Sequence, residues 1–180
     1  MTVEVLNESG VQVDVADLTR LSRFVMERMR LHPGTEMTLR LVDEGTIEAL
    51  NGQWMDKPTP TDVLAFPMDE LEPGRDGEEP PEGYLGDIAL CPQVAARQAS
   101  EAGHSELDEI RLLTTHGILH LLGYDHAEPE EHQVMFGLQA RLLAEWIGVR
   151  AGDELPEPVP APEPVPATQP VPATEPGAPT

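Results

Sequence analysis

Three histidines lie close together in the stretch His-Gly-Ile-Leu-His-Leu-Leu-Gly-Tyr-Asp-His, which spans positions 116 to 126. His116 and His120 are four residues apart, so a helix would place both imidazoles on the same face, one turn apart. Gly123 follows at a position where a helix can end in the left-handed conformation that glycine readily adopts. The turn that it permits can bring His126 back toward the other two rings. Three converging imidazoles with an open fourth coordination position are typical of a catalytic zinc site.

The spacing H-x-x-x-H-x-x-G-x-x-H is that of the metzincin zinc peptidases, but the residue after the first histidine differs. In that class this residue is a glutamate, which acts as the general base that activates water for peptide hydrolysis. Here the position is occupied by Gly117, which has no side chain. A metal-dependent peptidase or another hydrolase therefore stays an alternative, and Gly117 weakens it.

Other roles for these residues are also open. A single histidine on an apolar helix is usually an ordinary core residue, and a structural zinc site usually has four protein ligands, often cysteines. Cys91 is the only cysteine, which excludes a cysteine-rich site, although Asp125 or Glu128 could supply a fourth ligand. Asp125, next to His126, is also the nearest candidate for a catalytic base. Alternatively, its carboxylate orients an imidazole instead of contacting the substrate.

The composition indicates an acidic chain with one domain. The chain has 180 residues and a formal net charge of -22, which argues against indiscriminate binding to polyanions. A bound divalent cation reverses the local field, so an enzyme acting on nucleic acid is not excluded. The single cysteine fits a reducing cytosol, and no apolar run approaches the roughly 18 residues that span a bilayer. The N-terminus lacks the features of a secretory signal. We therefore expect a cytoplasmic protein without a membrane partner.

Residues 151–180 differ in composition from the rest of the chain. They contain ten prolines, and no basic residue follows Arg150. This composition predicts a disordered tail, partly in polyproline II conformation, that serves as a spacer. A binding role for the tail is the alternative. We therefore divide the chain into a domain of residues 1–150 and a tail of residues 151–180.

The domain alternates predicted strands and helices. Alternating apolar residues predict four strands, at residues 3–7, 37–42, 61–67 and 83–91. Apolar residues at helical spacing, together with residues typical of helix ends, predict five helices. The first runs from Asp14 or Asp17 to about Leu31, and the second begins at Asp43 and has Ile47, Leu50 and Trp54 on its apolar side. The other three span residues 92–102, 105–122 and 129–148. Strand–helix–strand units favour parallel neighbours, whereas the loop at residues 68–82 could join an antiparallel hairpin or form a longer connection. The prediction is a mixed α/β fold: a small, mostly parallel four-stranded sheet packed with about five helices.

Five of the eleven basic side chains lie between positions 20 and 40, namely Arg20, Arg23, Arg28, Arg30 and Arg40. They form either a solvated surface with ordinary ion pairs or a small basic patch that contacts phosphate.

Several motifs, in the same order along the chain, resemble those of the YbeY endoribonucleases, which are ribosomal RNA maturation factors. Besides the histidine stretch, they are Leu50-Asn51, Pro-Thr-Asp-Val-Leu-Ala-Phe-Pro at 60–67 and Leu-Gly-Asp-Ile at 85–88. The resemblance covers about residues 3 to 148 and leaves out the tail. It implies a zinc-dependent, single-strand-specific endoribonuclease with one Zn2+ per chain, held by His116, His120 and His126.

The resemblance also implies a biological role. The expected substrate is single-stranded ribosomal RNA on the ribosome or its small subunit, and DNA is not expected. The expected processes are 3′-end maturation of 16S ribosomal RNA and ribosome quality control. A non-catalytic ribosome-assembly factor with a structural metal is a further alternative.

One residue departs from the family pattern. Many members have an arginine directly after the aromatic residue that follows Leu-Asn, and this arginine is implicated in activity. Here Met55 follows Trp54, so that role cannot be carried over. Lys57 or the arginines between positions 20 and 40 could supply positive charge instead. Ala65, in place of the commoner serine, is a minor change.

Overall fold

The structure is a computed structural model that describes residues 1–55, 61–155, 157–158 and 160–164. The predicted tail therefore falls partly outside the described residues, as does Lys57. Along the described chain the elements are β1 (Thr2–Asn7), α1 (Val15–Arg28), β2 (Glu36–Leu41), α2 (Glu44–Met55), β3 (Val63–Pro67), β4 (Tyr84–Leu90), α3 (Pro92–Ala102), α4 (Glu106–Leu121) and α5 (Pro129–Ala151). The predicted mixed α/β fold is confirmed.

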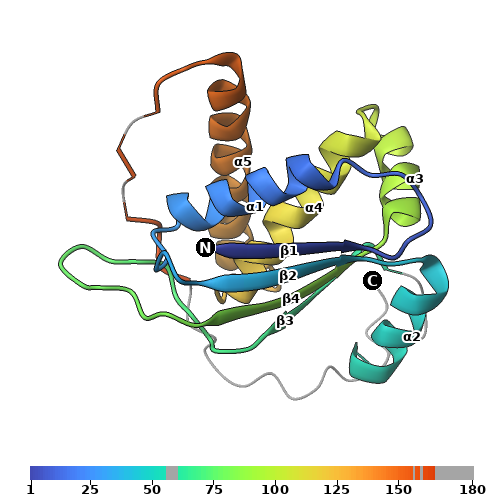
Figure 1. Cartoon of the computed structure of the whole chain (residues 1–180), viewed down its shortest axis with the longest axis horizontal. Coiled ribbons are helices and arrows are strands. Elements are labelled where there is room, and N and C mark those ends of the chain that lie inside the picture. Colours follow the sequence, from blue (N-terminus) through green and yellow to red (C-terminus); the bar gives the residue numbers. More distant parts are fainter. Residues whose placement is uncertain (56–60, 156, 159, 165–180) are drawn as a thin grey trace.

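The four strands form one sheet in the order β1-β2-β4-β3 (Figure 1). β1 pairs with β2 and β2 with β4 in parallel, whereas β3 runs antiparallel to β4. The interpretation of residues 61–91 as an antiparallel hairpin is therefore right. Gly86 permits a close approach at this pair, because a Cβ there would lie 2.3 Å from the carbonyl oxygen of Phe66. β3 is thus an edge strand, and its partner β4 lies beneath α4.

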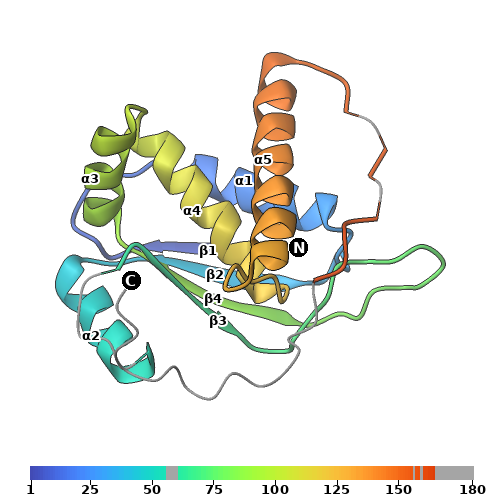
Figure 2. The same ribbon diagram turned by 180° about the vertical axis from the view of Figure 1, so that it is seen from behind.

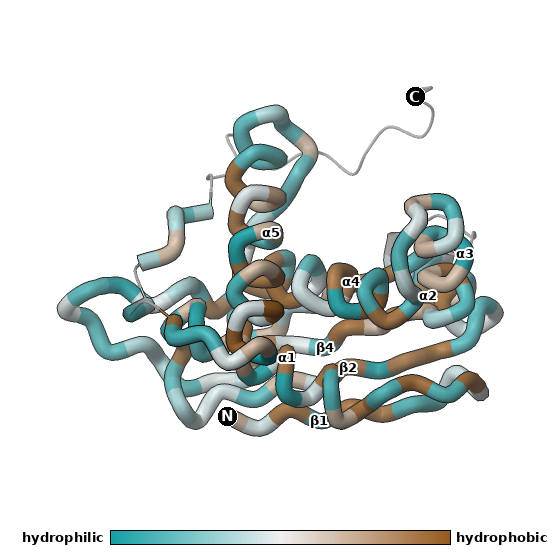
Figure 3. The backbone as a smooth tube through the Cα atoms, turned by 90° about the horizontal axis from the view of Figure 1, so that it is seen from above, coloured by the Kyte–Doolittle hydropathy of each residue, from teal (hydrophilic) through white to brown (hydrophobic). Residues whose placement is uncertain are grey.

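Helices α1, α4 and α5 lie on one face of the sheet (Figure 2). α4 contacts α1, α3, α5, β3 and β4, which makes it the central helix of the described fold. Its apolar residues and those of the strands beneath it are visible in Figure 3. Ile88, Ile118 and Leu18 are fully buried in this core. Each such side chain contributes roughly 1.5–3 kcal/mol by burial, so the position of α4 is strongly fixed.

Helix α2 lies against the opposite face of the sheet and closes a second, smaller core. Ile47 is fully buried there and Leu50 packs against the cluster, as predicted. Trp54 was expected on the same apolar side, but 62% of it is exposed. Trp54 lies in the last turn of α2, and among the described residues its ring contact is an edge-to-face one with Phe66, with centroids 6.2 Å apart. Cys91 is buried in this core, and burial raises the pKa of its thiol.

Two helix ends differ from the sequence prediction. α1 is capped by Asp14, whose side chain accepts a hydrogen bond from the backbone N–H of Asp17, but it ends at Arg28 instead of Leu31. The chain leaves the helix because Arg30 takes a left-handed conformation, with φ at 59°. α5 continues past Gly148 to the left-handed Gly152. A glycine inside a helix costs only about 1 kcal/mol, so Gly148 is a weak stop signal.

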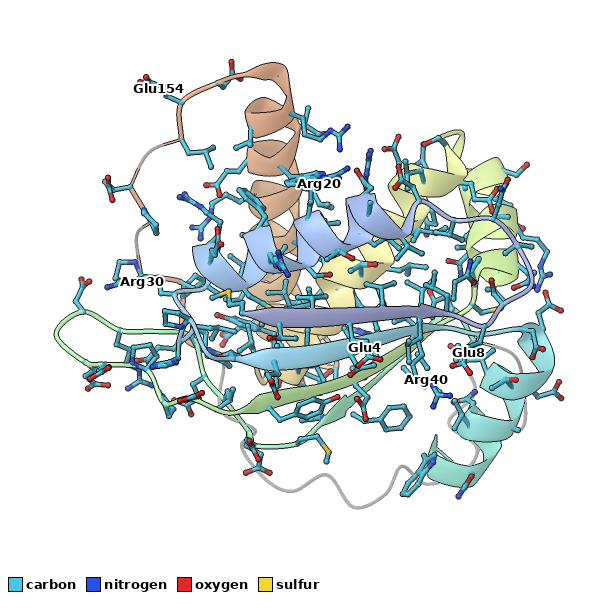
Figure 4. All side chains as sticks on the ribbon, in the orientation of Figure 1. Glu4, Glu8, Arg20, Arg30, Arg40 and Glu154 are labelled. Atoms are coloured by element: carbon cyan, nitrogen blue, oxygen red, sulfur yellow. The ribbon has the colours of Figure 1, made fainter. Side chains whose placement is uncertain are left out.

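The arginines between positions 20 and 40 do not form one patch. Figure 4 shows Arg20 on α1, Arg30 beyond the end of this helix, and Arg40 beside Glu8 on the sheet. Arg30 lies 2.7 Å from a carboxylate oxygen of Asp76, and Arg40 lies 2.8 Å from one of Glu8. These contacts favour the interpretation as ordinary ion pairs. No helix in the described part of the chain is both long and apolar enough to cross a membrane.

Candidate metal centre

The C-terminal half of α4 and the turn after it carry the three histidines, as the sequence predicted. His116 and His120 lie one turn apart on α4, which is capped by Ser105, whose hydroxyl accepts a hydrogen bond from the N–H of Asp108. The helix ends before Gly123, which has a φ of 95°. This left-handed residue reverses the chain direction, so His126 returns toward the helix.

The three imidazoles converge. The Nε2 atoms of His116 and His120 are 3.0 Å apart, and one ring nitrogen from each of the three residues lies within 4.8 Å of the other two. The ring centroid of His126 is 5.3 Å from that of His116 and 5.2 Å from that of His120. Zinc–nitrogen bonds of about 2.0–2.1 Å in a tetrahedral site separate ligand nitrogens by roughly 3.3 Å. The cluster therefore has the dimensions that one such ion needs.

Two further contacts determine which nitrogen of each ring can bind a cation. Nδ1 of His116 is 2.8 Å from Oε1 of Gln139, and Nδ1 of His120 is 2.9 Å from the backbone oxygen of Tyr124. Both oxygens can only accept, so both Nδ1 atoms donate and carry the ring proton. In the neutral rings the two Nε2 lone pairs therefore face each other at 3.0 Å. Such an arrangement is repulsive unless a cation lies between the lone pairs, so the donor set fits a metal ion.

The surroundings of the rings favour the neutral, metal-binding form. Burial lowers the pKa of His116, and the charge of His126 adds to this, although the hydrogen bond that His116 donates to Gln139 opposes it. Burial also lowers the pKa of His120 to about 4, with the neighbouring His116 and His126 acting in the same direction. At neutral pH both side chains are therefore uncharged, and no proton on Nε2 would compete with a metal.

Gly117 faces the sheet, where the glutamate of a peptidase would be crowded by Ile88. A Cβ at this position would meet side-chain atoms of Ile88 at 3.0, 3.1 and 3.4 Å, closer than most real contacts. Ile88 is itself fully buried on β4. A side chain at position 117 would therefore crowd Ile88, which would have to shift by a few tenths of an ångström within the core. The peptidase alternative thus lacks its general base because position 117 is a glycine, and the contact of this position with Ile88 disfavours a glutamate there.

Asp125 lies at the edge of the candidate centre. Its side chain is exposed, and its Oδ1 accepts a hydrogen bond of 2.7 Å from the N–H of His126. Together with His120, Tyr124 and residues of β3, it lines a cavity of about 360 Å3. The described contact is to the backbone and not to an imidazole, so Asp125 shapes the turn that carries His126. Its role as a base stays a prediction.

Gln139 is a functional residue that the sequence analysis missed. It lies on α5, is 4% exposed, and holds His116 from the side opposite to the cluster. A signal was present, because Gln139 is a polar residue in a row of apolar ones at helical spacing, between Met135 and Leu142. The Tyr124 carbonyl carried no such signal, since any residue could supply a backbone oxygen. The side chain of Met55 and all of Lys57 lie outside the described part of the chain, so neither can be placed relative to the histidines.

Comparison with known proteins yields one family. The family described as endoribonuclease YbeY matches residues 4–147. An endoribonuclease YbeY of a Nocardioides species is 66% identical over 146 residues, which cover 81% of this chain and 98% of that protein. The endoribonuclease YbeY of Thermobifida fusca is 58% identical over 146 residues, covering 81% of this chain and 94% of that protein.

A solved structure shares the fold. The solution structure of a Thermotoga maritima protein aligns with a TM-score of 0.53 and 28% sequence identity, covering 86% of this chain and 98% of that one. The family match spans most of β1, all of β2, β3 and β4, the histidine cluster and most of α5. The resemblance seen in the sequence is confirmed: the chain belongs to the YbeY endoribonuclease family.

Proposed function

We propose that this protein is a cytoplasmic, zinc-dependent, single-strand-specific endoribonuclease that acts in 3′-end maturation of small-subunit ribosomal RNA and in ribosome quality control. Membership of the family supports the endoribonuclease class and an RNA substrate. We add four features that family membership does not by itself support: zinc as the ion, specificity for single strands, the ribosomal target and the cellular location. We assign the activity to residues 1–150, with one ion per chain held by His116, His120 and His126.

A single observation carries the metal assignment. The Nδ1 atoms of His116 and His120 are used by Gln139 and by the Tyr124 carbonyl, which leaves two Nε2 lone pairs 3.0 Å apart. In the described structure neither Nε2 lone pair has a carboxylate or amine of the chain as partner. Neutral imidazoles in this arrangement suit zinc and several other divalent metals. The two lone pairs therefore point to one position at which a cation would contact both rings, and no charged group of the described chain lies there.

The protein residues position the reaction. A bound zinc ion supplies a Lewis acid that lowers the pKa of water toward about 7 and offsets the negative charge that grows on the phosphoryl group. Gln139 and the Tyr124 carbonyl hold the ring protons at Nδ1, which orients the lone pairs of His116 and His120 toward the ion. His126 is exposed, so the cluster is open to solvent on its side. Phosphodiester hydrolysis therefore needs no glutamate at position 117.

Asp125 is the proposed base. One carboxylate oxygen accepts the N–H of His126, and a carboxylate has further acceptor capacity for a proton from water. Its position on the cavity beside His120 places it next to the reacting phosphate in this proposal. Asp125→Asn keeps the acceptor for the His126 N–H and removes the basicity, so it should retain the metal and lose cleavage. If Asp125→Asn cleaves RNA normally, the base lies elsewhere.

The central experiment measures metal content and RNA cleavage on the same preparation. Purified protein is assayed by elemental analysis and incubated with a labelled single-stranded RNA, the same RNA as a duplex, and casein. We expect one zinc per chain, cleavage of the single strand, and intact duplex and casein. His116→Ala should lose both zinc and cleavage.

Two outcomes would replace the proposal by one of the alternatives. Digestion of casein without RNA cleavage would support the peptidase. Melting on chelation, with no metal able to restore RNA cleavage, would support a structural metal in an assembly factor. The ribosomal target is tested with a precursor of 16S ribosomal RNA, where cleavage near the 3′ end is expected and a scrambled RNA of equal length is the control.

A further inference from the structure

The C-terminal segment returns to the candidate metal centre after leaving α5. We call residues 160–164 the strap. In Figures 1 and 2 the chain descends from the far end of α5 to the region of the β3–β4 loop. Ala161 packs against the main hydrophobic core and is partly buried. A segment whose composition predicts a free spacer thus makes specific contacts with the domain.

The strongest contact of the strap is to Tyr124, in the turn that carries His126. The phenol of Tyr124 donates a hydrogen bond to the backbone oxygen of Pro162, and Tyr124 is only 3% exposed. The backbone oxygen of the same residue accepts the bond that orients His120. One residue therefore holds a metal ligand through its main chain and the strap through its side chain.

The strap also places a negative charge and a proline ring beside the histidines. Oε1 of Glu163 lies 3.5 Å from a guanidinium nitrogen of Arg75 in the β3–β4 loop. Pro164 lies 3.8 Å from the position that a Cβ of Gly123 would take. Both strap residues line a cavity of about 520 Å3 together with Arg75 and His120. The wall next to His120 is therefore supplied in part by the tail.

The strap lies outside the part of the chain that is common to the family. The family match ends at residue 147, and the 146 aligned residues already cover 98% of the Nocardioides relative. The domain is thus complete in that relative without a counterpart of the strap. A feature added beside the candidate centre can change access to it without changing its ligands.

We propose that Tyr124, Gly123 and Arg75 form a docking surface for the chain's own proline-rich strap, and that the docked strap competes with single-stranded RNA at the rim of the three-histidine site. The competition rests on the proposed function, whereas the docking does not. Glu163 places a negative charge beside the candidate centre and occupies Arg75, so docking disfavours a phosphate at the same place. Prolines restrict the free segment, which lowers the entropy lost on docking.

Docking is tested by backbone relaxation of the full-length protein. The heteronuclear 1H–15N NOE reports motion faster than nanoseconds at the amides of Ala161 and Glu163. We expect values close to those of the domain in the wild type. Ala161→Asn and Tyr124→Phe should both lower them toward the values of a free chain. If the wild-type amides of the strap are already as mobile as a free chain, the docking proposal is wrong, whatever the protein does to RNA.

Competition is tested with variants matched for charge. Glu163→Gln removes the strap's carboxylate from Arg75, which keeps Glu72 at 3.1 Å as its other partner. Glu157→Gln removes the same charge from an exposed residue of the same tail. We expect Glu163→Gln to raise kcat/KM for a short single-stranded RNA by about twofold to fivefold, the range of an exposed ion pair. Glu157→Gln should change it by less than Glu163→Gln does. Ala161→Asn, which alters no residue of the domain, should have the largest effect.

The outcomes separate this inference from the proposed function. An ordered strap with equal kcat/KM in all four proteins would overturn the competition and leave the endoribonuclease intact. Equal increases for Glu163→Gln and Glu157→Gln would show a general charge effect and would also overturn it. If none of the proteins, the wild type included, binds or cleaves RNA, then the proposed function fails and the competition with it, while the relaxation data still decide the docking.

Discussion

Two polar clusters join α4 to α5, one in each half of α4, and they are built in opposite ways. In the first, the buried carboxylate of Asp17 on α1 accepts two hydrogen bonds of 2.8 and 2.9 Å from Arg111 of α4 and one of 2.5 Å from Arg150 of α5. In the second, Nδ1 of His116 donates a hydrogen bond of 2.8 Å to Oε1 of Gln139, and the ring of His116 faces His120. The first cluster consists of charged groups that satisfy one another, and the second of uncharged groups that do not.

The difference distinguishes a cluster that stabilises the fold from one that awaits a ligand. Burial raises the pKa of Asp17, but the hydrogen bonds and charge of Arg111, with the charge of Arg150, outweigh it and lower the pKa overall. Asp17 thus keeps its charge although it is only 1% exposed. In the histidine cluster, burial lowers the pKa of His120 with no carboxylate in hydrogen-bond contact to restore the charge. Buried polar groups normally have partners, so lone pairs without one indicate a site.

Removal of a ligand from the second cluster should have the largest effect. His120→Ala removes the ring between His116 and the Tyr124 carbonyl, so two ligands remain and zinc should no longer be retained at stoichiometric level. We expect a loss of metal affinity well above the roughly 100-fold limit for residues that only support a ligand. RNA cleavage should fall to background. The measurement is competition with a chromophoric chelator, followed by elemental analysis after dialysis.

His104→Ala is the matched control for this substitution. His104 also lies near an end of α4, but it pairs with Glu109 and is not part of the cluster. It should retain wild-type zinc and cleavage. If His120→Ala retained one zinc per chain, the assignment of the three ligands would be wrong.

Removal of the carboxylate from the first cluster should affect stability without affecting metal binding. Asp17→Asn removes the buried carboxylate that Arg111 and Arg150 share, and Arg111 keeps only the exposed carboxylate of Asp108 at 3.2 Å among the described ion pairs. Breaking a buried ion pair costs about 3–5 kcal/mol, and the lower end is expected because the side chain of Arg150 is 46% exposed. We expect the free energy of unfolding in urea to fall by about 3 kcal/mol, with zinc affinity within about twofold of wild type under folding conditions. A large loss of zinc affinity in folded Asp17→Asn would contradict the separation of the two clusters.

The second cluster could be predicted from the sequence, whereas the first could not. His116, His120 and His126 are close along the chain, so helical spacing and one glycine suffice to bring them together. Asp17 and Arg150 are 133 residues apart, and only the packing of α1 against α5 makes them neighbours. From the sequence, Asp17 was a candidate for the cap of α1, a position that Asp14 takes. Local patterns therefore predict local sites, and long-range ion pairs require the fold.

The same distinction explains the rest of the fold prediction. Strands, helices and their mixed parallel and antiparallel arrangement followed from periodicity and connection length. The end of α5 could not be predicted in this way, because Gly148 can stay helical. The exposure of Trp54 could not be predicted either, because it depends on how little of the sheet α2 covers. The contacts of the strap could not be predicted either, since no apolar periodicity precedes Ala161 in the tail.

Gln139 offers a smaller change within the second cluster. Gln139→Leu removes the acceptor of the Nδ1 proton of His116 and leaves a buried N–H without a partner. Residues that support a metal ligand in this way are worth about 10- to 100-fold in metal affinity. Gln139→Glu keeps an acceptor of the same length and should stay within about tenfold of wild type, which distinguishes orientation of the ring from simple packing. Chelator competition measures both variants, and equal losses in both would exclude the orienting role.

The smallest expected effect is a pH dependence of the first cluster. The pKa of Asp17 in the folded protein lies below the unfolded value of 3.8, so the unfolded chain binds more protons between the two values. The stability that the carboxylate contributes is therefore complete well above pH 3.8 and is lost as the pH falls through the folded pKa. In urea unfolding of metal-free protein, the difference between wild type and Asp17→Asn should be constant from about pH 7 to 5 and should shrink toward about pH 3. Because asparagine does not titrate, only the wild type contributes this change, and a difference that stayed constant down to pH 3 would show that the arginines do not lower the pKa of Asp17.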